Sequence, residues 1–205
     1  LVVTNTLTLD ASKVYLLKGF VVVKSGGKLV IPAGTVIRAQ ADLNASPKNY
    51  ASIVIERGGQ IEVNGTATAP VVITSAKAAG SRDRGDWGGI IISGRAVNNQ
   101  GNNVQVEGFN NVAFDNQLAL HGGSDNNDNS GILRYLRLEF GGLAFEINRE
   151  ISQCLTDANE KLKVFIFCNI NKWKRANRIW HNLSQYVAFS IHCKNYFTSP
   201  NLIAF

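Results

Sequence analysis

The sequence predicts an all-β protein, a right-handed parallel β-helix in which successive coils stack into a solenoid. Three observations lead to this prediction. Short β-branched runs recur along the first two thirds of the 205 residues, glycine-rich turns separate them, and one motif repeats in the same orientation. β-Branched residues favour strands, and glycine adopts turn conformations that side chains forbid. Repetition in one orientation indicates a solenoid, whereas an antiparallel sandwich would show hairpin signals.

The repeat is clearest between residues 21–39 and 53–76. The first segment reads VVVKSGGKLVIPAGTVIRA, and the second aligns with it at an offset of 32 residues as IVIERGGQIEVNGTATAPVVITSA. The run Ile90–Ile92 restarts the pattern 37 residues later, and Leu133–Leu138 is expected to restart it about 42 residues further on. Each unit holds two or three short strands and no helical period. We therefore expect parallel strands of successive units to lie about 4.8 Å apart.

Apolar alternation within each unit predicts which side chains share a common core. The residues expected to point inward are Val21, Val23, Ile31, Val36, Ile53, Ile55, Ile61, Val63 and Val72. Trp87 precedes Gly88 and Gly89 at the start of the Ile90 run. We expect its side chain to be buried there, with the two glycines allowing the backbone to turn around it.

Composition divides the chain in two, because all 19 glycines lie between Gly19 and Gly142 and all three cysteines follow them. We assign residues 1–143 to the parallel β-helix and residues 144–205 to a tail that is helical or disordered. The tail is either a native cap or an out-of-frame remnant, because solenoids need capped ends. The formal charge of +6 is scattered rather than gathered in a stripe, so no nucleic-acid partner is expected. No segment is apolar for long enough to span a membrane.

The motifs resemble a family of exported right-handed parallel β-helix proteins of Bacteroidetes and marine bacteria, many of them associated with type IX secretion. The resemblance rests on the two repeat segments above, on GDWGGIIISGRAVNN, and on GGSDNNDNSGILRYLRLEFGGLAFE. It covers about residues 15–150 and ends where the glycines end. It implies an extracellular or cell-surface location and the stacked fold, and it implies no particular activity.

Four charged residues on one loop are the candidates for catalysis. Parallel β-helices often bind or cleave acidic polysaccharides with closely placed carboxylates and a neighbouring arginine. The segment SRDRGDW supplies Arg82, Asp83, Arg84 and Asp86 just before a strand. The alternative is a solvated turn in which Asp86 binds local backbone amides while Trp87 packs below.

The segment SDNNDNS offers oxygen ligands for a hard cation such as calcium, and Asp125 and Asp128 are the first candidates. It departs from the EF-hand pattern, because Ser130 stands where glycine belongs and Leu136 where the bidentate glutamate belongs. An ordinary polar turn held by Asx hydrogen bonds is the alternative. His121 is the only histidine before the tail and is expected to be a loop histidine without a catalytic partner.

The function that fits these observations is a secreted or cell-surface structural or adhesive module that binds surface polysaccharide or other surface components without catalysis. It needs no cofactor, apart from calcium if the SDNNDNS segment binds it. The competing hypothesis is a polysaccharide lyase or glycoside hydrolase that uses Asp83 and Asp86 with Arg84. An enzyme of that class needs two carboxylates about 5 to 9.5 Å apart on one groove.

Overall fold

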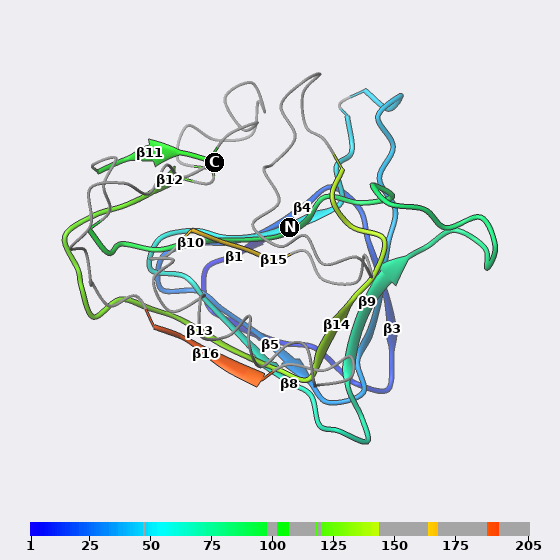
Figure 1. The fold of residues 1–205 in the computed structure, drawn as a ribbon, viewed down its shortest axis with the longest axis horizontal. Helices are drawn as coiled ribbons and strands as arrows, with labels where there is room; N and C mark the ends of the chain where they lie inside the picture. Colours follow the sequence, from blue (N-terminus) through cyan, green and yellow to red (C-terminus); the bar gives the residue numbers. More distant parts are fainter. Residues whose placement is uncertain are drawn as a thin grey trace, which may run out of the picture.

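The computed structural model describes residues 1–46, 48–97, 102–106, 118 and 120–143, together with the backbones of two strands, 164–167 and 188–192. Over this part the regular structure consists of strands, and three sheets form the walls of a β-helix, with parallel pairing throughout except between β13 and β16 (Figure 1). The predicted fold class is confirmed. One further pair, β11 (Val104–Gln105) and β12 (Leu120–His121), is antiparallel and lies outside the three walls.

Each wall is built from strands that are far apart in the sequence. Sheet A holds, in spatial order, β1 (Val2–Val3), β4 (Phe20–Val23), β7 (Ser52–Ile55), β10 (Gly89–Ser93) and β15 (Val164–Phe167). Sheet B holds β2 (Thr6–Thr8), β5 (Lys28–Pro32), β8 (Gln60–Asn64), β13 (Asn129–Arg134) and β16 (Ala188–His192). Sheet C holds β3 (Val14–Leu17), β6 (Val36–Ala39), β9 (Val71–Ser75) and β14 (Leu136–Leu138).

The strand register confirms the sequence repeat. Val21 pairs with Ile53 and Leu29 with Ile61, both at the predicted offset of 32 residues. Ile53 pairs in turn with Ile90, at the predicted offset of 37. In sheet C the offset grows to 36, since Val36 pairs with Val72 after a longer turn between β8 and β9. Parallel pairing in register stacks aliphatic side chains on one another at these positions.

One part of the repeat assignment was wrong. Leu133 does not start another turn above Ile90 but pairs with Val63 in sheet B, and Leu138 pairs with Ile73 in sheet C. The segment between β10 and β13 is therefore an insertion within one coil, which runs β10, β13, β14. A positive φ of 46° at Tyr135 breaks the expected single run into two strands on two walls.

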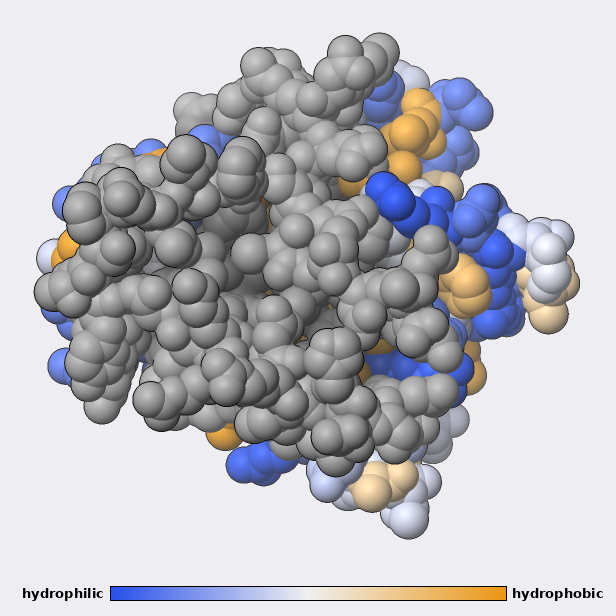
Figure 2. Space-filling model, viewed as in Figure 1, coloured by the Kyte–Doolittle hydropathy of each residue, from blue (hydrophilic) through white to orange (hydrophobic). Residues whose placement is uncertain are grey.

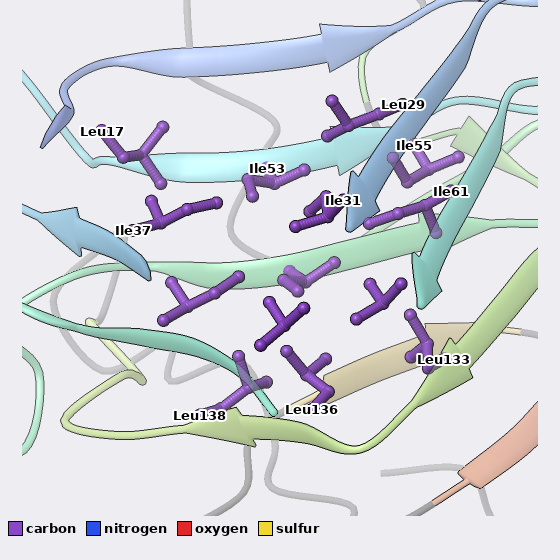
Figure 3. Close-up of a cluster of buried hydrophobic side chains, with 14 of the residues drawn as sticks. Leu17, Leu29, Ile31, Ile37, Ile53, Ile55, Ile61, Leu133, Leu136 and Leu138 are labelled. Carbon is purple, nitrogen blue, oxygen red and sulfur yellow. The ribbon is translucent and has the colours of Figure 1, made fainter. Parts of the chain in front are cut away.

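The core lies inside the three walls, where leucine and isoleucine side chains from all of them meet (Figure 3). Of the nine residues predicted to face it, six are buried: Val23, Ile31, Ile53, Ile55, Ile61 and Val63. Val21 is partly buried and packs against the same cluster. The prediction was wrong for Val36 and Val72. Their neighbours Ile37 and Val71 point into the core instead, and the two valines stack on each other on the outer face of sheet C. Each of these strands begins with two adjacent apolar residues, so the sequence alone did not determine which of the two side chains points inward.

The repeated Gly-Gly pairs mark the corner between sheets A and B, and the two glycines of each pair serve different needs. Gly26 and Gly58 have φ values of 81° and 80°, in the left-handed region that side chains rarely adopt. A Cβ on Gly27 would lie 2.4 Å from the carbonyl oxygen of Val3, and one on Gly59 would lie 2.5 Å from that of Val23. Close contact between successive coils therefore requires the second glycine.

The inner strands of sheet A, β4, β7 and β10, carry apolar side chains that are buried on the outer face as well as the inner one. Val22, Val54 and Ile91 point away from the coil interior, yet none of them is exposed. They form a second apolar cluster with Phe20 and with two residues of the insertion, Val106 and Leu118. The ring of Tyr50 stacks on Phe20 with centroids 5.8 Å apart. The insertion after β10 thus covers the outer face of this wall.

The described segments of the tail are strands, where a helix or disorder was expected. β15 lies parallel to β10, with Phe165 opposite Ile91, and β16 lies antiparallel to β13. Unpaired backbone groups at the edges of β10 and β13 explain why strands form there. A helical cap would have Trp173 and Trp180 as its large apolar side chains, and both residues lie outside the described part of the chain.

Candidate functional site

Two neighbouring loops at the corner between sheets C and A carry the sequence-predicted catalytic residues. Residues 40–51 connect β6 to β7, and residues 76–88 connect β9 to β10. Backbone hydrogen bonds hold the loops together: the Ala41 amide donates to the Asp86 carbonyl at 3.3 Å, and the Gly88 amide donates to the Tyr50 carbonyl at 2.9 Å and to the Ala51 carbonyl at 3.2 Å. In Figure 2 the coloured residues along the right-hand side of the view are mostly hydrophilic, with a few apolar ones among them. We call these two segments the corner loops.

Asp86 is not available to solvent, because its side chain is only 4% exposed and both carboxylate oxygens are occupied. Ser75 Oγ donates to Oδ2 at 2.6 Å, the Asp83 amide donates to Oδ2 at 3.0 Å, and Lys77 Nζ donates to Oδ1 at 2.6 Å. Burial alone would raise the pKa of Asp86, but the hydrogen bonds from Lys77, Ser75 and the Asp83 amide outweigh it and lower the pKa below the usual 3.8. Asp86 is therefore an ionised anchor for the loop.

Asp83 and Arg84 lie on the surface of the same loop. Both are exposed, and Asp83 Oδ1 accepts a hydrogen bond of 2.7 Å from the Arg84 amide. Arg82 is half-buried and donates from Nε to the Lys77 carbonyl at 3.0 Å. The structure thus brings the four predicted residues onto one loop but divides them by depth. Asp83 and Arg84 face solvent, while Asp86 faces the protein.

Trp87 is fully buried where the β10 wall begins, as predicted from sequence. Its indole Nε1 donates to the Glu139 carbonyl at 2.8 Å, and its backbone forms a parallel bridge with Gly141. The Gly85 amide also donates to the Gly141 carbonyl at 3.1 Å. The motif GDWGG therefore fastens one corner loop to the coil that follows.

Sequence reasoning missed the partners of Asp86. Ser75 and Lys77 precede it by 11 and 9 residues, across a turn that no local pattern describes. One signal was present, because the register stacks Leu17, Ala39 and Ser75 in a single column. A buried serine in an otherwise apolar column needs a polar partner. Glu139, which accepts a 2.8 Å hydrogen bond from Thr74 Oγ1, was likewise not predicted as part of this corner.

The acidic segment 124–130 lies at the opposite corner, where sheet A meets sheet B. Asp128 has a side chain only 2% exposed, and its carboxylate accepts hydrogen bonds from the Arg95 amide at 2.8 Å and from Arg95 Nε at 3.1 Å. Asp125 is exposed, accepts from the Asn127 amide at 3.0 Å, and lies 3.8 Å from Arg95 Nη2. Within the described residues no three His, Cys, Asp or Glu side chains gather as a metal site would require. Because Arg95 and the Asn127 amide occupy these carboxylates, the contacts favour an ordinary polar turn over a calcium site for segment 124–130.

Calcium is expected to leave the melting temperature unchanged, because an ion at Asp125 and Asp128 would have to displace the Arg95 guanidinium from both carboxylates. A ligand that binds only the folded state raises that temperature by mass action. The measurement is a thermal melt with calcium and then with excess chelator. A rise that the chelator reverses and that Asp128→Ala abolishes would instead establish the calcium site.

His121 is buried at the end of the insertion, opposite Val104 in the β11–β12 pair. Burial is the larger cause that lowers the pKa of His121 below 6.5, and the positive charge of Arg57 lowers it further. Arg57 donates from Nη1 to the carbonyl of Gly122 at 2.9 Å, which ties the insertion to the corner between β7 and β8. The folded protein therefore favours the neutral form of His121, which lies within the packed end of the insertion.

Replacing His121 with glutamine should flatten the acid side of the stability profile. As the pH falls below about 6.5, the unfolded chain binds a proton at His121 while the folded chain resists it, so protonation favours unfolding. Stability should fall through this window more steeply in the wild type than in His121→Gln. Urea unfolding at a series of pH values measures the difference, and the other two histidines are common to both proteins. Parallel profiles would show that His121 titrates alike in both states.

The comparisons with known proteins agree with this architecture. The model of the pectate-lyase-like β-helix domain matches residues 1–154, so the chain belongs to that family. No curated protein and no solved structure matches the chain. In the part that the structure describes, no helix is long and apolar enough to cross a membrane.

Proposed function

We propose that this chain is an exported, cell-surface β-helix module that holds a surface polysaccharide on its corner loops and does not cleave it. The observation that carries the proposal is the environment of Asp86. Its carboxylate is buried and accepts three hydrogen bonds, and its lowered pKa keeps it ionised. A general acid needs a raised pKa and reach to the substrate, and Asp86 has neither.

The outer face of sheet A supports the same proposal. A wall of parallel strands could present a polar groove, but here its outward residues are the apolar Val22, Val54 and Ile91, packed beneath the insertion. No carboxylate from the described strands of this wall points outward. The corner loops, in contrast, carry polar side chains that reach solvent, among them Asp42, Asn44 and Arg84. Loops held on a rigid scaffold are the usual place for binding residues.

Export and a surface location are part of the proposal. Domains of the matched family are often extracellular. The resemblance in residues 15–150 to exported proteins of Bacteroidetes and marine bacteria points the same way, and it adds type IX secretion as the route. The absence of cysteine from residues 1–143 is compatible with an oxidising compartment, because no thiol there can form a wrong disulfide.

The test combines binding and turnover on one set of acidic and neutral polysaccharides. We expect affinity electrophoresis to show retardation by at least one of them, reduced in Arg84→Ala and Asp83→Ala. We expect no new reducing ends and no unsaturated uronate absorbance. Asp125→Ala is the matched control, because it removes an exposed carboxylate at the opposite corner. No retardation by any polysaccharide would remove the binding proposal.

The competing function is a lyase or hydrolase, which the description of the matched family favours. Asp83 would then be the functional carboxylate and Arg84 its basic neighbour, since both reach solvent. Product formation that Asp83→Asn abolishes, with the melting temperature unchanged, would establish the enzyme. Product formation that survives Asp83→Asn and Arg84→Ala would place the chemistry elsewhere on the chain.

A further inference from the structure

Asn64 and Gly65, at the end of β8, form the only Asn-Gly pair in the sequence. An asparagine followed by glycine is the pair most open to deamidation. The backbone nitrogen of the second residue attacks the side-chain carbonyl carbon of the first, and glycine has no Cβ to obstruct that approach. Neither residue belongs to the corner loops. The reactivity of the pair depends on how the fold holds its two reacting groups.

The fold requires glycine at position 65. A Cβ there would lie 2.6 Å from the carbonyl oxygen of Tyr135 and 2.8 Å from that of Arg134, both in the next coil. It would also lie 3.0 Å from the amide nitrogen of Val71, where the chain enters sheet C. Close packing at the corner between sheets B and C therefore keeps a glycine next to Asn64, and with it the labile pair.

In the folded protein the nucleophile of this reaction, the Gly65 amide, is engaged. It donates to the carbonyl oxygen of Arg134 at 3.1 Å. Asn64 is held in a strand between two others, paired with Pro32 on one side and with Arg134 on the other. Ring closure needs a free amide nitrogen and a rotation of the backbone at Asn64. This corner must therefore open before the pair can react.

We propose that Asn64 is a latent deamidation site, which the folded protein protects and which reacts in the unfolded chain to a product that does not refold. The Gly65 nitrogen forms a bond to the Asn64 side-chain carbonyl carbon and loses its proton, and the side-chain nitrogen leaves as ammonia. Water then opens the cyclic imide at either of its two carbonyls, which gives aspartate or isoaspartate. The reaction needs no oxidant or reductant.

The two products have different effects on β8. Aspartate at position 64 keeps the backbone intact and places a carboxylate beside Arg134, its partner in the register of sheet B. Isoaspartate routes the main chain through the former side chain, which adds one carbon to the backbone just before Gly65. Because Gly65 is packed closely against the next coil, a longer backbone displaces its amide from the Arg134 carbonyl. Time spent unfolded therefore makes unfolding irreversible.

The first test compares deamidation of the full chain in native buffer and in guanidinium chloride, at one mildly alkaline pH and with a reducing agent for the three cysteines. Peptide mass mapping and enzymatic detection of isoaspartate follow position 64 over time. We expect the reaction to be at least roughly tenfold slower in the folded protein, because only the locally open fraction reacts. A peptide of residues 60–69 in both solutions corrects for effects of the denaturant itself.

The second test dilutes the denaturant after increasing times and measures refolding by circular dichroism. The refolded fraction should fall as isoaspartate accumulates, and the refolded chains should contain aspartate at position 64 but little isoaspartate. Asn64→Gln is the matched control, because glutamine keeps the amide but closes a larger ring far more slowly. This variant should keep its capacity to refold over the same period.

Equal rates in the folded and unfolded chain overturn the protection. Refolded chains as rich in isoaspartate as the denatured sample overturn the block on refolding. If Asn64→Gln loses refolding as fast as the wild type, another chemical change is responsible and the proposal fails. If Asn64→Gln does not fold at the outset, Asn64→Ser replaces it, and the isoaspartate content of the refolded wild type decides in either case.

Discussion

Replacing Gly131 with alanine is expected to prevent folding of the β-helix. Gly131 pairs with Ile61 in sheet B at a φ of 120°, and a Cβ there would lie 1.9 Å from the Ile61 carbonyl oxygen. That oxygen belongs to a strand fixed on both sides, so it has little room to move. We expect the cost to exceed the about 1–3 kcal/mol of ordinary overpacking. Total stability is only about 5–15 kcal/mol, so circular dichroism should show little native structure at room temperature.

Gly80→Ala is the matched control for this prediction. Gly80 also has a positive φ, 84°, but nothing lies within 4 Å of the position that its Cβ would take. The variant should therefore carry only the backbone strain, about 1–2 kcal/mol, and should fold. Equal stability of the two variants would show that sheet B moves aside to accommodate the methyl group.

Trp87→Ala should lower the free energy of unfolding by about 3–5 kcal/mol, the range for deleting a large buried aromatic side chain. The ring is fully buried in the main core, and its loss also leaves the Glu139 carbonyl without its indole donor. Urea unfolding followed by circular dichroism measures the change. Tryptophan fluorescence is a poorer probe, because the substitution removes one of the three tryptophans.

Trp87→Phe separates packing from hydrogen bonding. It keeps an aromatic ring in the core but loses the donor to Glu139, so its cost should be smaller, about 1–3 kcal/mol. Trp87→Ala and Trp87→Phe with equal effects would assign the stabilisation to the hydrogen bond. Effects below about 1 kcal/mol in both would contradict the structural account of the GDWGG motif.

The local sequence pattern was sufficient to predict where the strands lie and, for many of them, which residues pair between successive coils. The pairs Val21 with Ile53 and Ile53 with Ile90 follow from aligning one repeat on the next. The alignment succeeds because parallel in-register stacking is most favourable when equivalent residues lie on one another. It failed for Leu133, since a long insertion separates it from β10 and sequence spacing does not show which wall an insertion returns to.

The sequence predicted which loop carries the candidate site, but it did not predict how the side chains of that loop are buried and hydrogen-bonded. SRDRGDW shows charged residues close together in sequence, and the structure keeps Arg82, Asp83 and Arg84 near the surface. The role of Asp86 depends on Ser75 and Lys77, which reach it through the fold. Whether a carboxylate is a catalyst or an anchor depends on its burial and donors, and these are properties of packing rather than of spacing.

The sequence by itself determined that this protein is a stack of short parallel strands, because β-branched runs, Gly-Gly corners and one repeated motif all specify the same coil. Only the tertiary structure decided what lies on either side of each wall. The continuous apolar runs Phe20–Val23 and Ile90–Ile92 do not alternate, because Val106 and Leu118 cover the outer face of sheet A. That cover comes from an insertion, and its position depends on long-range contacts that no local pattern encodes.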